Sequence, residues 1–162
     1  MSTHIRPVEP GDLGWIIASH GALYAQEFHF DARFEVDIAR KAVALCDRAE
    51  PFTRLWIAEV DGEKAGSIAV SQMGKGLAFI NFLLVLPGYR GRGIARQLMQ
   101  QALDHAAGHG LRRVRLETYS CLVGARRLYA AMGFRLAEPV KPLERYGQRF
   151  EQEFWALDLS QA

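Results

Sequence analysis

The strongest constraint on this sequence comes from residues 77–98, where an apolar run leads into glycines and arginines and then into an amphipathic pattern. Leu77–Val85 is apolar on both faces except at Asn81, which is typical of a central strand covered on both sides. From Gly91 onward, apolar residues recur at helical spacing, at Ile94, Leu98, Ala102 and Ala106. We therefore expect a buried strand that passes through a short loop directly into a long helix.

The loop between this strand and this helix is suited to an anion. It reads Pro87-Gly88-Tyr89-Arg90-Gly91-Arg92-Gly93-Ile94-Ala95. The first turn of a helix leaves backbone N–H groups unpaired and carries about half a positive charge. Gly91 and Gly93 leave room for a diphosphate to reach those groups. Positive charge is added by three arginines: Arg90, Arg92 and Arg96.

Two other phosphate-binding motifs fit this loop less well. A P-loop requires a Gly-Lys-Ser/Thr ending, which is absent here. A dinucleotide fingerprint would read Gly91-x-Gly93-x-x-Arg96, with arginine in place of the third small residue. Its first glycine would also lie six residues past Val85, where a tight turn is expected. Glu117 lies about where a ribose-binding acid would, so the dinucleotide interpretation stays open.

The remaining pattern predicts an α/β (α+β) fold in one domain over residues 1–162, with the element order βααβββαβαββ. The sheet is expected to be mixed and mostly antiparallel, with one parallel crossover around residues 80, 100 and 115. Asp61-Gly62 predicts a tight hairpin, and residues 138–148, with two prolines, predict a loop. Expected strands are 3–6, 54–60, 64–71, 77–85, 114–118, 134–137 and 150–159, and expected helices are 13–24, 31–49, 94–106 and 123–132.

Composition narrows the classes of partner. The 20 basic and 18 acidic residues leave a formal charge of +2, which is too balanced for a nucleic-acid footprint across the surface. The chain has neither an apolar signal core at its N-terminus nor a run of about 18 apolar residues. Cys46 and Cys121 lie far apart, without a second Cys or His at metal-ligand spacing. We therefore expect a cytoplasmic protein that binds no nucleic acid, membrane or metal.

Two motifs resemble those of the GCN5-related N-acetyltransferase (GNAT) superfamily. Arg90-x-x-Gly93-x-Ala95 is similar to its Gln/Arg-x-x-Gly-x-Gly/Ala signature, and Leu128–Phe134 resembles its Leu-Tyr-x-x-x-Gly-Phe helix end. The element order is also similar, so the resemblance covers nearly the whole chain. It implies direct transfer of acetyl from acetyl-CoA to a primary amine of a small molecule or peptide, without a metal. A monomer and a homodimer both remain open.

The resemblance implies roles for individual residues. Tyr129 matches the tyrosine that protonates the departing thiolate, and a phenol with a pKa near 10 is protonated at pH 7. The asparagine that often lies seven residues earlier is Leu122 here, so its hydrogen bond must come from elsewhere, such as Ser120 or a backbone group. The implied cofactor-binding residues are Leu83, Leu84 and Val85 for pantetheine, and Arg90, Gly91, Arg92, Gly93, Ile94, Ala95 and Arg96 for pyrophosphate.

The base and the acceptor site are predicted from weaker signals. Related enzymes often use a glutamate on the central strand, where this chain has Asn81, which cannot act as a base. The early helices of this fold wall the acceptor pocket, so Glu27, within the aromatic cluster Tyr24–Phe30, is the candidate base. The predicted acceptor-binding residues are Tyr24, Glu27 and Asn81, and the cluster favours a small cationic amine. Cys121 has no histidine at a recognisable spacing, which disfavours a covalent intermediate.

Two further interpretations remain. The run from His20 to Phe28 also resembles an acetyltransferase subgroup that is sometimes fused to winged-helix regulators, which raises the expected importance of His20 and Glu27. The alternative to an enzyme is a non-catalytic acyl-CoA-binding sensor module that regulates a protein partner.

Overall fold

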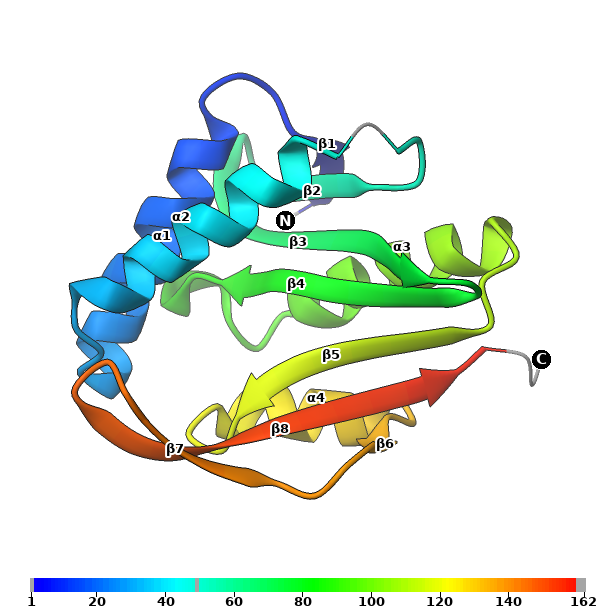
Figure 1. Ribbon diagram of the computed structural model, residues 1–162. Coiled ribbons are helices and arrows are strands. Elements are labelled where there is room, and N and C mark those ends of the chain that lie inside the picture. The colour runs from blue at the N-terminus through cyan, green and yellow to red at the C-terminus, as the bar shows by residue number, and fades with distance from the viewer. Residues whose placement is uncertain (1, 49, 160–162) are drawn as a thin grey trace.

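The structure is a computed structural model that describes residues 2–48 and 50–159 as one mixed sheet with helices on both faces (Figure 1). Its helices and strands are, in chain order, β1 (Thr3–Pro7), α1 (Asp12–Phe28), α2 (Ala32–Cys46), β2 (Arg54–Val60), β3 (Glu63–Gly74), β4 (Leu77–Val85), the 3-10 turn η1 (Pro87–Tyr89), α3 (Ile94–Gly108), β5 (Arg113–Tyr119), α4 (Val123–Ala131), β6 (Arg135–Leu136), β7 (Lys141–Arg145) and β8 (Gln148–Asp158).

Neighbouring strands follow the order β1-β2-β3-β4-β5-β8-β6, and β7 pairs with β8. Every pair of strands in the described residues is antiparallel except β4 with β5, which are joined by α3. Asp61 and Gly62 both have positive φ, 51° and 84°, as the predicted β2–β3 hairpin turn requires. The predicted α/β class, the mixed sheet and its single parallel crossover are thus confirmed.

The predicted loop at residues 138–148 is wrong, because residues 141–145 form β7 and the element order becomes βααβββαβαβββ. The β7–β8 hairpin turns at Tyr146-Gly147, whose φ angles are 57° and 75°. Pro142 pairs with Glu151 on an edge strand, where a missing N–H is tolerated. Most of β7 is exposed, so it lacks the apolar alternation that identifies a strand in sequence.

The two expected early helices are present. Asp31 caps α2, since its carboxylate accepts a hydrogen bond from the backbone N–H of Arg33 at 3.0 Å. Within the described residues α2 ends at Cys46, and the predicted end at Ala49 lies outside them.

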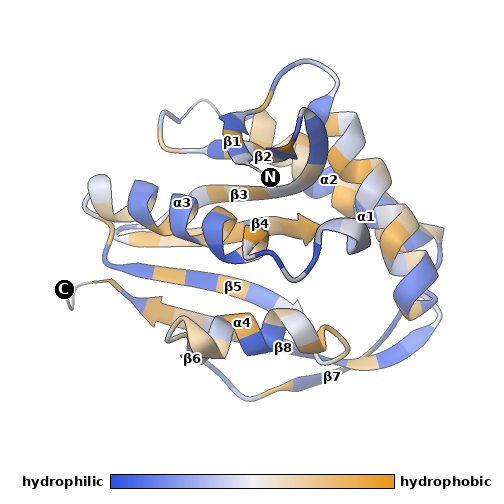
Figure 2. Cartoon of the chain, turned by 180° about the vertical axis from the view of Figure 1, so that it is seen from behind, coloured by the Kyte–Doolittle hydropathy of each residue, from blue (hydrophilic) through white to orange (hydrophobic). Residues whose placement is uncertain are grey.

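Each face of the sheet has its own hydrophobic cluster. Residues of α1 and α2 pack on one face, for example Ile16, Phe34 and Ile38. Residues of α3 and α4 pack on the other, for example Leu98 and Tyr129. Figure 2, seen from behind, shows α3 and α4 in front of the sheet and the largely hydrophobic β4 between the layers. The sheet therefore separates two hydrophobic layers, each closed by its own pair of helices.

A buried ionic cluster fixes the start of α1. The Asp12 carboxylate is 2% exposed and lies 2.6 Å from Arg6 Nη1 and 2.9 Å from Lys64 Nζ. It also accepts the backbone N–H of Glu9 at 2.7 Å. The hydrogen bond from Arg6 is the main reason that the pKa of Asp12 lies well below its usual value of 3.8. Asp12 is therefore ionised at neutral pH and joins β1, β3 and α1.

Candidate functional site

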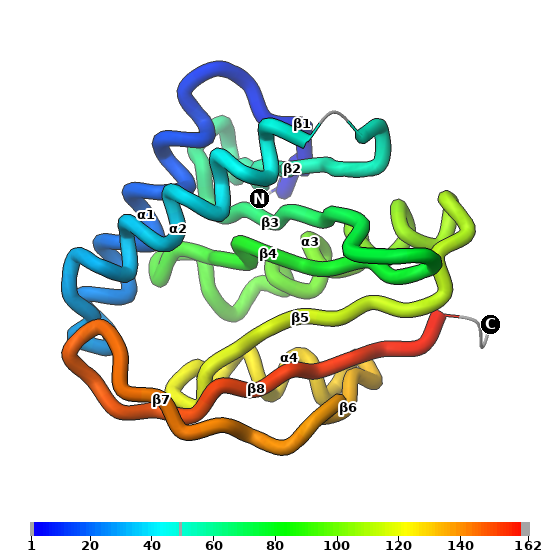
Figure 3. Tube along the Cα trace, viewed as in Figure 1, coloured from blue at the N-terminus to red at the C-terminus, as the bar shows by residue number. Residues whose placement is uncertain are grey.

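The parallel pairing of β4 with β5 stops part-way along both strands. It runs from Leu77 opposite Arg113 to Ile80 opposite Leu116, and the two strands then diverge (Figure 3). An unpaired strand edge offers N–H and C=O groups to an extended ligand. On its β5 side, residues 81–85 of β4 therefore face an opening.

A β-bulge in β4 lies beside this opening. Phe82 has a φ of 58°, which a bulky residue rarely adopts, and its carbonyl oxygen accepts a hydrogen bond from Ser67 Oγ at 2.7 Å. A Cβ at Gly66 would lie 2.5 Å from the carbonyl oxygen of Leu84, so this close approach of β3 to β4 requires glycine. Backbone strain of this kind is typically found at binding and active sites.

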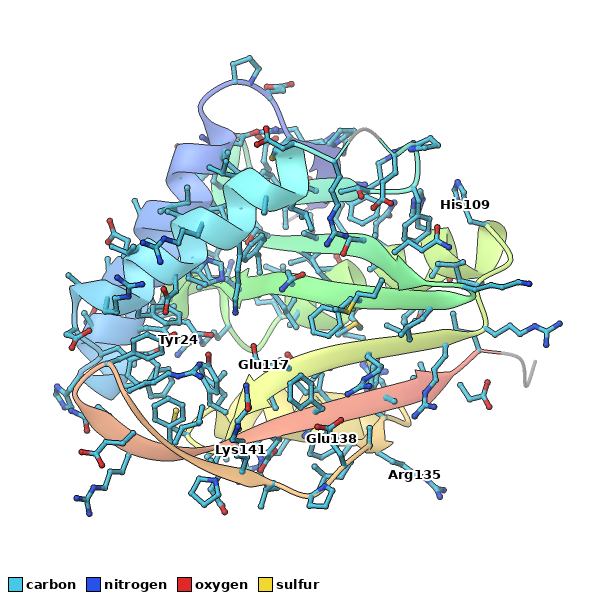
Figure 4. The ribbon with its side chains drawn as sticks, in the orientation of Figure 1. Tyr24, His109, Glu117, Arg135, Glu138 and Lys141 are labelled. Atoms are coloured by element: carbon cyan, nitrogen blue, oxygen red, sulfur yellow. The ribbon has the colours of Figure 1, made fainter. Side chains whose placement is uncertain are left out.

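A cavity of about 690 Å³ fills the opening and reaches both faces of the sheet. Figure 4 shows Tyr24 and Glu117 on the side where β4 and β5 diverge. On one face the cavity is lined by a helical stripe: His20, Leu23, Tyr24, Glu27 and Phe28 of α1, and Phe34, Ile38 and Lys41 of α2. On the other face it is lined by the glycine loop, the start of α3, and α4. The cavity thus joins the two regions that the sequence assigned to cofactor and acceptor.

All but one of the predicted site residues line this cavity. They are Tyr24, Glu27, Asn81, Leu83, Leu84, Val85, Arg90, Gly91, Gly93, Ile94, Ala95, Arg96 and Tyr129. The exception is Arg92, whose guanidinium lies 5.5 Å from the centre of the Tyr89 ring. Within the loop, the Arg92 side chain therefore lies over Tyr89 and is not part of the cavity wall.

The glycine loop has a conformation that suits an anion. Gly91 and Gly93 both have a φ of 78°, and a Cβ added at either would have no atom of the described residues within 4 Å, apart from the glycine itself and its two chain neighbours. Gly93 is the N-cap of α3 and supplies no capping side chain. The N–H groups in the first turn of α3 therefore depend on another acceptor. The open space and these donors fit a diphosphate.

Tyr129 reaches the cavity from α4. Its side chain is 6% exposed, and its ring centre lies 5.9 Å from that of Phe134. Burial raises the pKa of its phenol above the usual 10, so Tyr129 stays protonated at neutral and mildly alkaline pH. Burial likewise raises the pKa of Tyr24, with smaller contributions from nearby Tyr129 and Cys121. Two proton-bearing phenols thus lie near each other in the cavity wall.

Glu27 is paired, which bears on its predicted role as a base. Its two carboxylate oxygens accept hydrogen bonds of 2.6 and 2.7 Å from the guanidinium of Arg90. These bonds lower the pKa of Glu27 and make its carboxylate a weaker proton acceptor. The pair also occupies the Arg90 side chain, which was expected to add charge for the phosphates. The geometry therefore favours Glu27 as a link between α1 and the loop and opposes its use as the base.

Glu117 and Lys41 also line the cavity, although the sequence did not indicate either of them as a candidate for the acceptor site. Asn81 and Glu117 each follow the last paired residue of their strand, so they lie opposite each other where the opening begins. Lys41 Nζ lies 3.4 Å from Glu117 Oε1, and the Gln152 amide donates to the other Glu117 oxygen. The available signal was on α2, where Lys41 shares the spacing of buried Phe34 and Ile38.

Two hydroxyl groups near Leu122 differ in their contacts. Ser120 is not in the cavity lining, and its Oγ accepts the backbone N–H of Glu151 at 2.9 Å. It is therefore poorly placed to replace the missing asparagine. Thr118 is in the lining and 2% exposed, and its Oγ1 has no hydrogen-bond partner among the described residues.

Thr118→Val is expected to leave the stability of the ligand-free protein unchanged or to raise it. A buried hydroxyl without a partner costs about 1–3 kcal/mol, which an isosteric methyl group avoids. The melting temperature is expected to rise by up to several degrees, at about 2–4 °C per kcal/mol for a chain of this size. Ser120→Ala is the matched control and is expected to lower it, because it removes a hydrogen bond. A melting temperature that falls as far in Thr118→Val as in Ser120→Ala would contradict this account.

Cys121 also lines the cavity. Its thiol is half-buried and free, and burial raises its pKa above the usual value. A protonated thiol is a weak nucleophile, in line with the expectation against a covalent route. Across residues 2–48 and 50–159, no group of three or more His, Cys, Asp or Glu side chains is close enough to hold a metal ion. In the same residues, no helix is long and apolar enough to cross a membrane.

Comparison with known families agrees with this geometry. A family model described as the acetyltransferase (GNAT) family matches residues 21–134, which contain both the glycine loop and Tyr129. The chain belongs to the GNAT family. The dinucleotide-binding interpretation of the loop is thereby set aside.

Individual relatives of this GNAT chain differ in length and name. It is 33% identical over 107 residues to N-acetyltransferase 8F1 of Rattus norvegicus, which covers 63% of this chain and 44% of the rat protein. It is 30% identical over 126 residues to streptothricin acetyltransferase of Escherichia coli, which covers 68% of this chain and 72% of that protein. The chain therefore spans less than half the length of the rat relative.

A solved structure supports the fold of this GNAT chain. The yncA protein of Salmonella typhimurium, solved with its cofactor acetyl-CoA, superposes with a TM-score of 0.78 at 19% identity. The match covers 100% of this chain and 96% of yncA.

Proposed function

We propose that this GNAT chain is an N-acetyltransferase that transfers the acetyl group of acetyl-CoA to a primary amine of a small molecule or peptide. The observation that carries the proposal is the cavity through the sheet, with an anion-binding loop on one face and aromatic and acidic side chains on the other. When bound, acetyl-CoA supplies an activated acetyl thioester at the end of an amide-bearing arm and an anionic diphosphate. The fold neighbour yncA was solved with this same compound.

The chain provides a separate feature for each part of the donor. Backbone groups of Leu83–Val85, beside the opening, pair with the amides of the arm. The first-turn N–H groups of α3, behind Gly91 and Gly93, bind the diphosphate. Arg96 lies in the cavity lining and adds positive charge. The donor thus enters from the face covered by α3 and α4.

The acceptor enters from the opposite face, where α1 and α2 form the wall. Glu117 takes one proton from the acceptor ammonium. It is better placed for this role than Glu27, because Arg90 binds both oxygens of Glu27, whereas Lys41 contacts one oxygen of Glu117 at 3.4 Å. Tyr129 donates its phenolic proton to the leaving sulfur as the N–C bond forms and the C–S bond breaks. The second amine proton restores Tyr129, and Glu117 passes the first to solvent, so one proton is released per turnover. No side chain is acylated in this direct transfer.

The resemblance of residues 20–28 to acetyltransferases fused to winged-helix regulators stays a prediction. His20 lines the cavity but is 2% exposed, and its Nδ1 lies 2.8 Å from the carbonyl oxygen of Ile16. Burial lowers the pKa of His20 to about 4, so it is neutral at physiological pH.

The proposal is tested by calorimetry with acetyl-CoA followed by thiol-release assays across a panel of amines. We expect saturable binding of acetyl-CoA and thiol release that depends on an added amine. Binding without thiol release for any amine would favour the sensor module. Absence of binding would overturn both interpretations.

A further inference from the structure

The acceptor half of the cavity holds two opposite charges that are loosely paired. From α1, α2 and β5, the charged side chains that line the cavity in the described residues are Glu27, Lys41 and Glu117. Glu27 is already bound through both oxygens by Arg90. The other two are separated by 3.4 Å, with side chains 46% exposed for Lys41 and 19% for Glu117. A single, long, partly exposed contact of this kind contributes little stability, so a ligand can replace it.

A ligand that carries both charges matches this arrangement. A simple cationic amine that approaches Glu117 meets the positive charge of Lys41 beside it. In an α-amino acid, the ammonium and carboxylate groups sit on one carbon atom, so one ligand satisfies both side chains at once. The amide of Asn81, across the opening from Glu117, offers a further polar contact to the ammonium group.

The wall beside these charges selects the remainder of the ligand. Tyr24 and Phe34 stack with ring centres 4.4 Å apart, and both line the cavity together with Phe28. Burying a charged or strongly polar group against such a wall without a partner is unfavourable. An apolar side chain instead gains by leaving water.

We propose that the acceptor is a free α-amino acid with an apolar side chain, whose ammonium group binds Glu117 and Asn81 and whose carboxylate binds Lys41. This inference rests on the proposed acetyl transfer and specifies its substrate class. A peptide N-terminus and a protein lysine lack the free α-carboxylate beside the reacting amine. A polyamine brings only positive charge to Lys41.

The test compares acceptors that differ only at the carboxylate. L-Leucine and L-phenylalanine are assayed against isoamylamine and phenethylamine, against the two amino-acid amides, and against a Leu-Gly dipeptide. One charge-assisted hydrogen bond corresponds to about a 10- to 100-fold change in an equilibrium constant. We expect kcat/KM for the free amino acids to exceed that for the matched amines and amides by about this factor.

Two variants test whether Lys41 causes the preference for an acceptor with a carboxylate. Lys41→Met is expected to raise KM for the amino acids by about 10- to 100-fold and to bring amine and amino acid close to equality. Arg40→Met is the matched control, since it removes the same charge from the neighbouring exposed position outside the cavity lining. It is expected to leave the preference unchanged.

Several results would overturn the inference. They are equal or better turnover of the amines, amides or dipeptide by the wild type, or a carboxylate preference that survives in Lys41→Met. Binding of acetyl-CoA with no thiol release from any free amino acid would also overturn it, while leaving the donor site as proposed. Failure to bind acetyl-CoA would instead overturn the proposed function itself.

Discussion

Tyr129→Phe is expected to lower turnover by about 10²- to 10⁴-fold, the usual contribution of a positioned general acid. The substitution removes only the phenolic oxygen, and the ring keeps its packing against Phe134 and Trp155. Binding of acetyl-CoA, measured by calorimetry, is expected to change little. The loss should therefore appear in kcat, measured by thiol release at saturating concentrations of both substrates.

Tyr24→Phe provides the discriminating comparison, because Tyr24 also lines the cavity and burial raises the pKa of its phenol as well. Its substitution is expected to act mainly on KM for the acceptor. Since the pKa of Tyr129 is raised above 10, the wild-type enzyme should show no loss of kcat from ionisation of this phenol between pH 7 and 10. Unchanged turnover in Tyr129→Phe, or a kcat loss confined to Tyr24→Phe, would transfer the acid role away from Tyr129.

Asp12→Ala is expected to lower the free energy of unfolding by about 3–5 kcal/mol, the usual effect of breaking a buried ion pair from one side. The substitution removes the acceptor for Arg6, Lys64 and the Glu9 N–H, and leaves the largely buried Arg6 with fewer anionic partners. The melting temperature should fall on the order of 10 °C, measured by calorimetry in the absence of ligand. Asp104→Ala, which removes an exposed carboxylate, is the control and is expected to change stability by less than about 0.5 kcal/mol.

Asp12 also gives the protein a specific acid sensitivity. Its pKa is lower in the folded state, so its contribution to stability is present above the usual value of 3.8 and is lost as the pH falls below it. The stability difference between wild type and Asp12→Ala should therefore shrink as the pH falls below about 4. A difference that stays constant from pH 7 to pH 3 would show that Asp12 acts through packing alone.

The strand, loop and helix that we propose to bind the cofactor were predictable because their signals are local. Val85, Gly91, Gly93 and Ile94 are close in sequence. Val85 ends β4, Ile94 begins α3, and Gly91 and Gly93, which lie between them, have positive φ. The half of the cavity proposed for the acceptor was less predictable because its contacts join distant segments. Glu27 meets Arg90 across 63 positions, and Lys41 meets Glu117 across 76. No local pattern indicates which carboxylate is bound by an arginine and which is available to a ligand.

The edge of the sheet shows a second limit of sequence reasoning. Tyr146 adopts the positive φ that usually marks glycine or asparagine, so the β7–β8 turn carries a weak sequence signal. The bulge at Phe82 is similarly hidden within an apolar run, because Gly66 on the neighbouring strand accommodates it. In both places pairing with another strand sets a backbone conformation that the residue itself does not favour.

Because the sheet is open between β4 and β5, donor binding and acceptor binding can be assigned to different elements of the chain. The residues proposed to bind the donor lie in the glycine loop, in α3 and beside the β4 bulge, whereas those proposed to bind the acceptor lie mainly on α1, α2 and the far half of β5. The Glu27–Arg90 ion pair joins the α1 wall to the glycine loop. Lys41 and Phe34 lie on α2, away from the glycine loop. Substitutions at these two positions are therefore expected to change the acceptor specificity with little effect on donor binding.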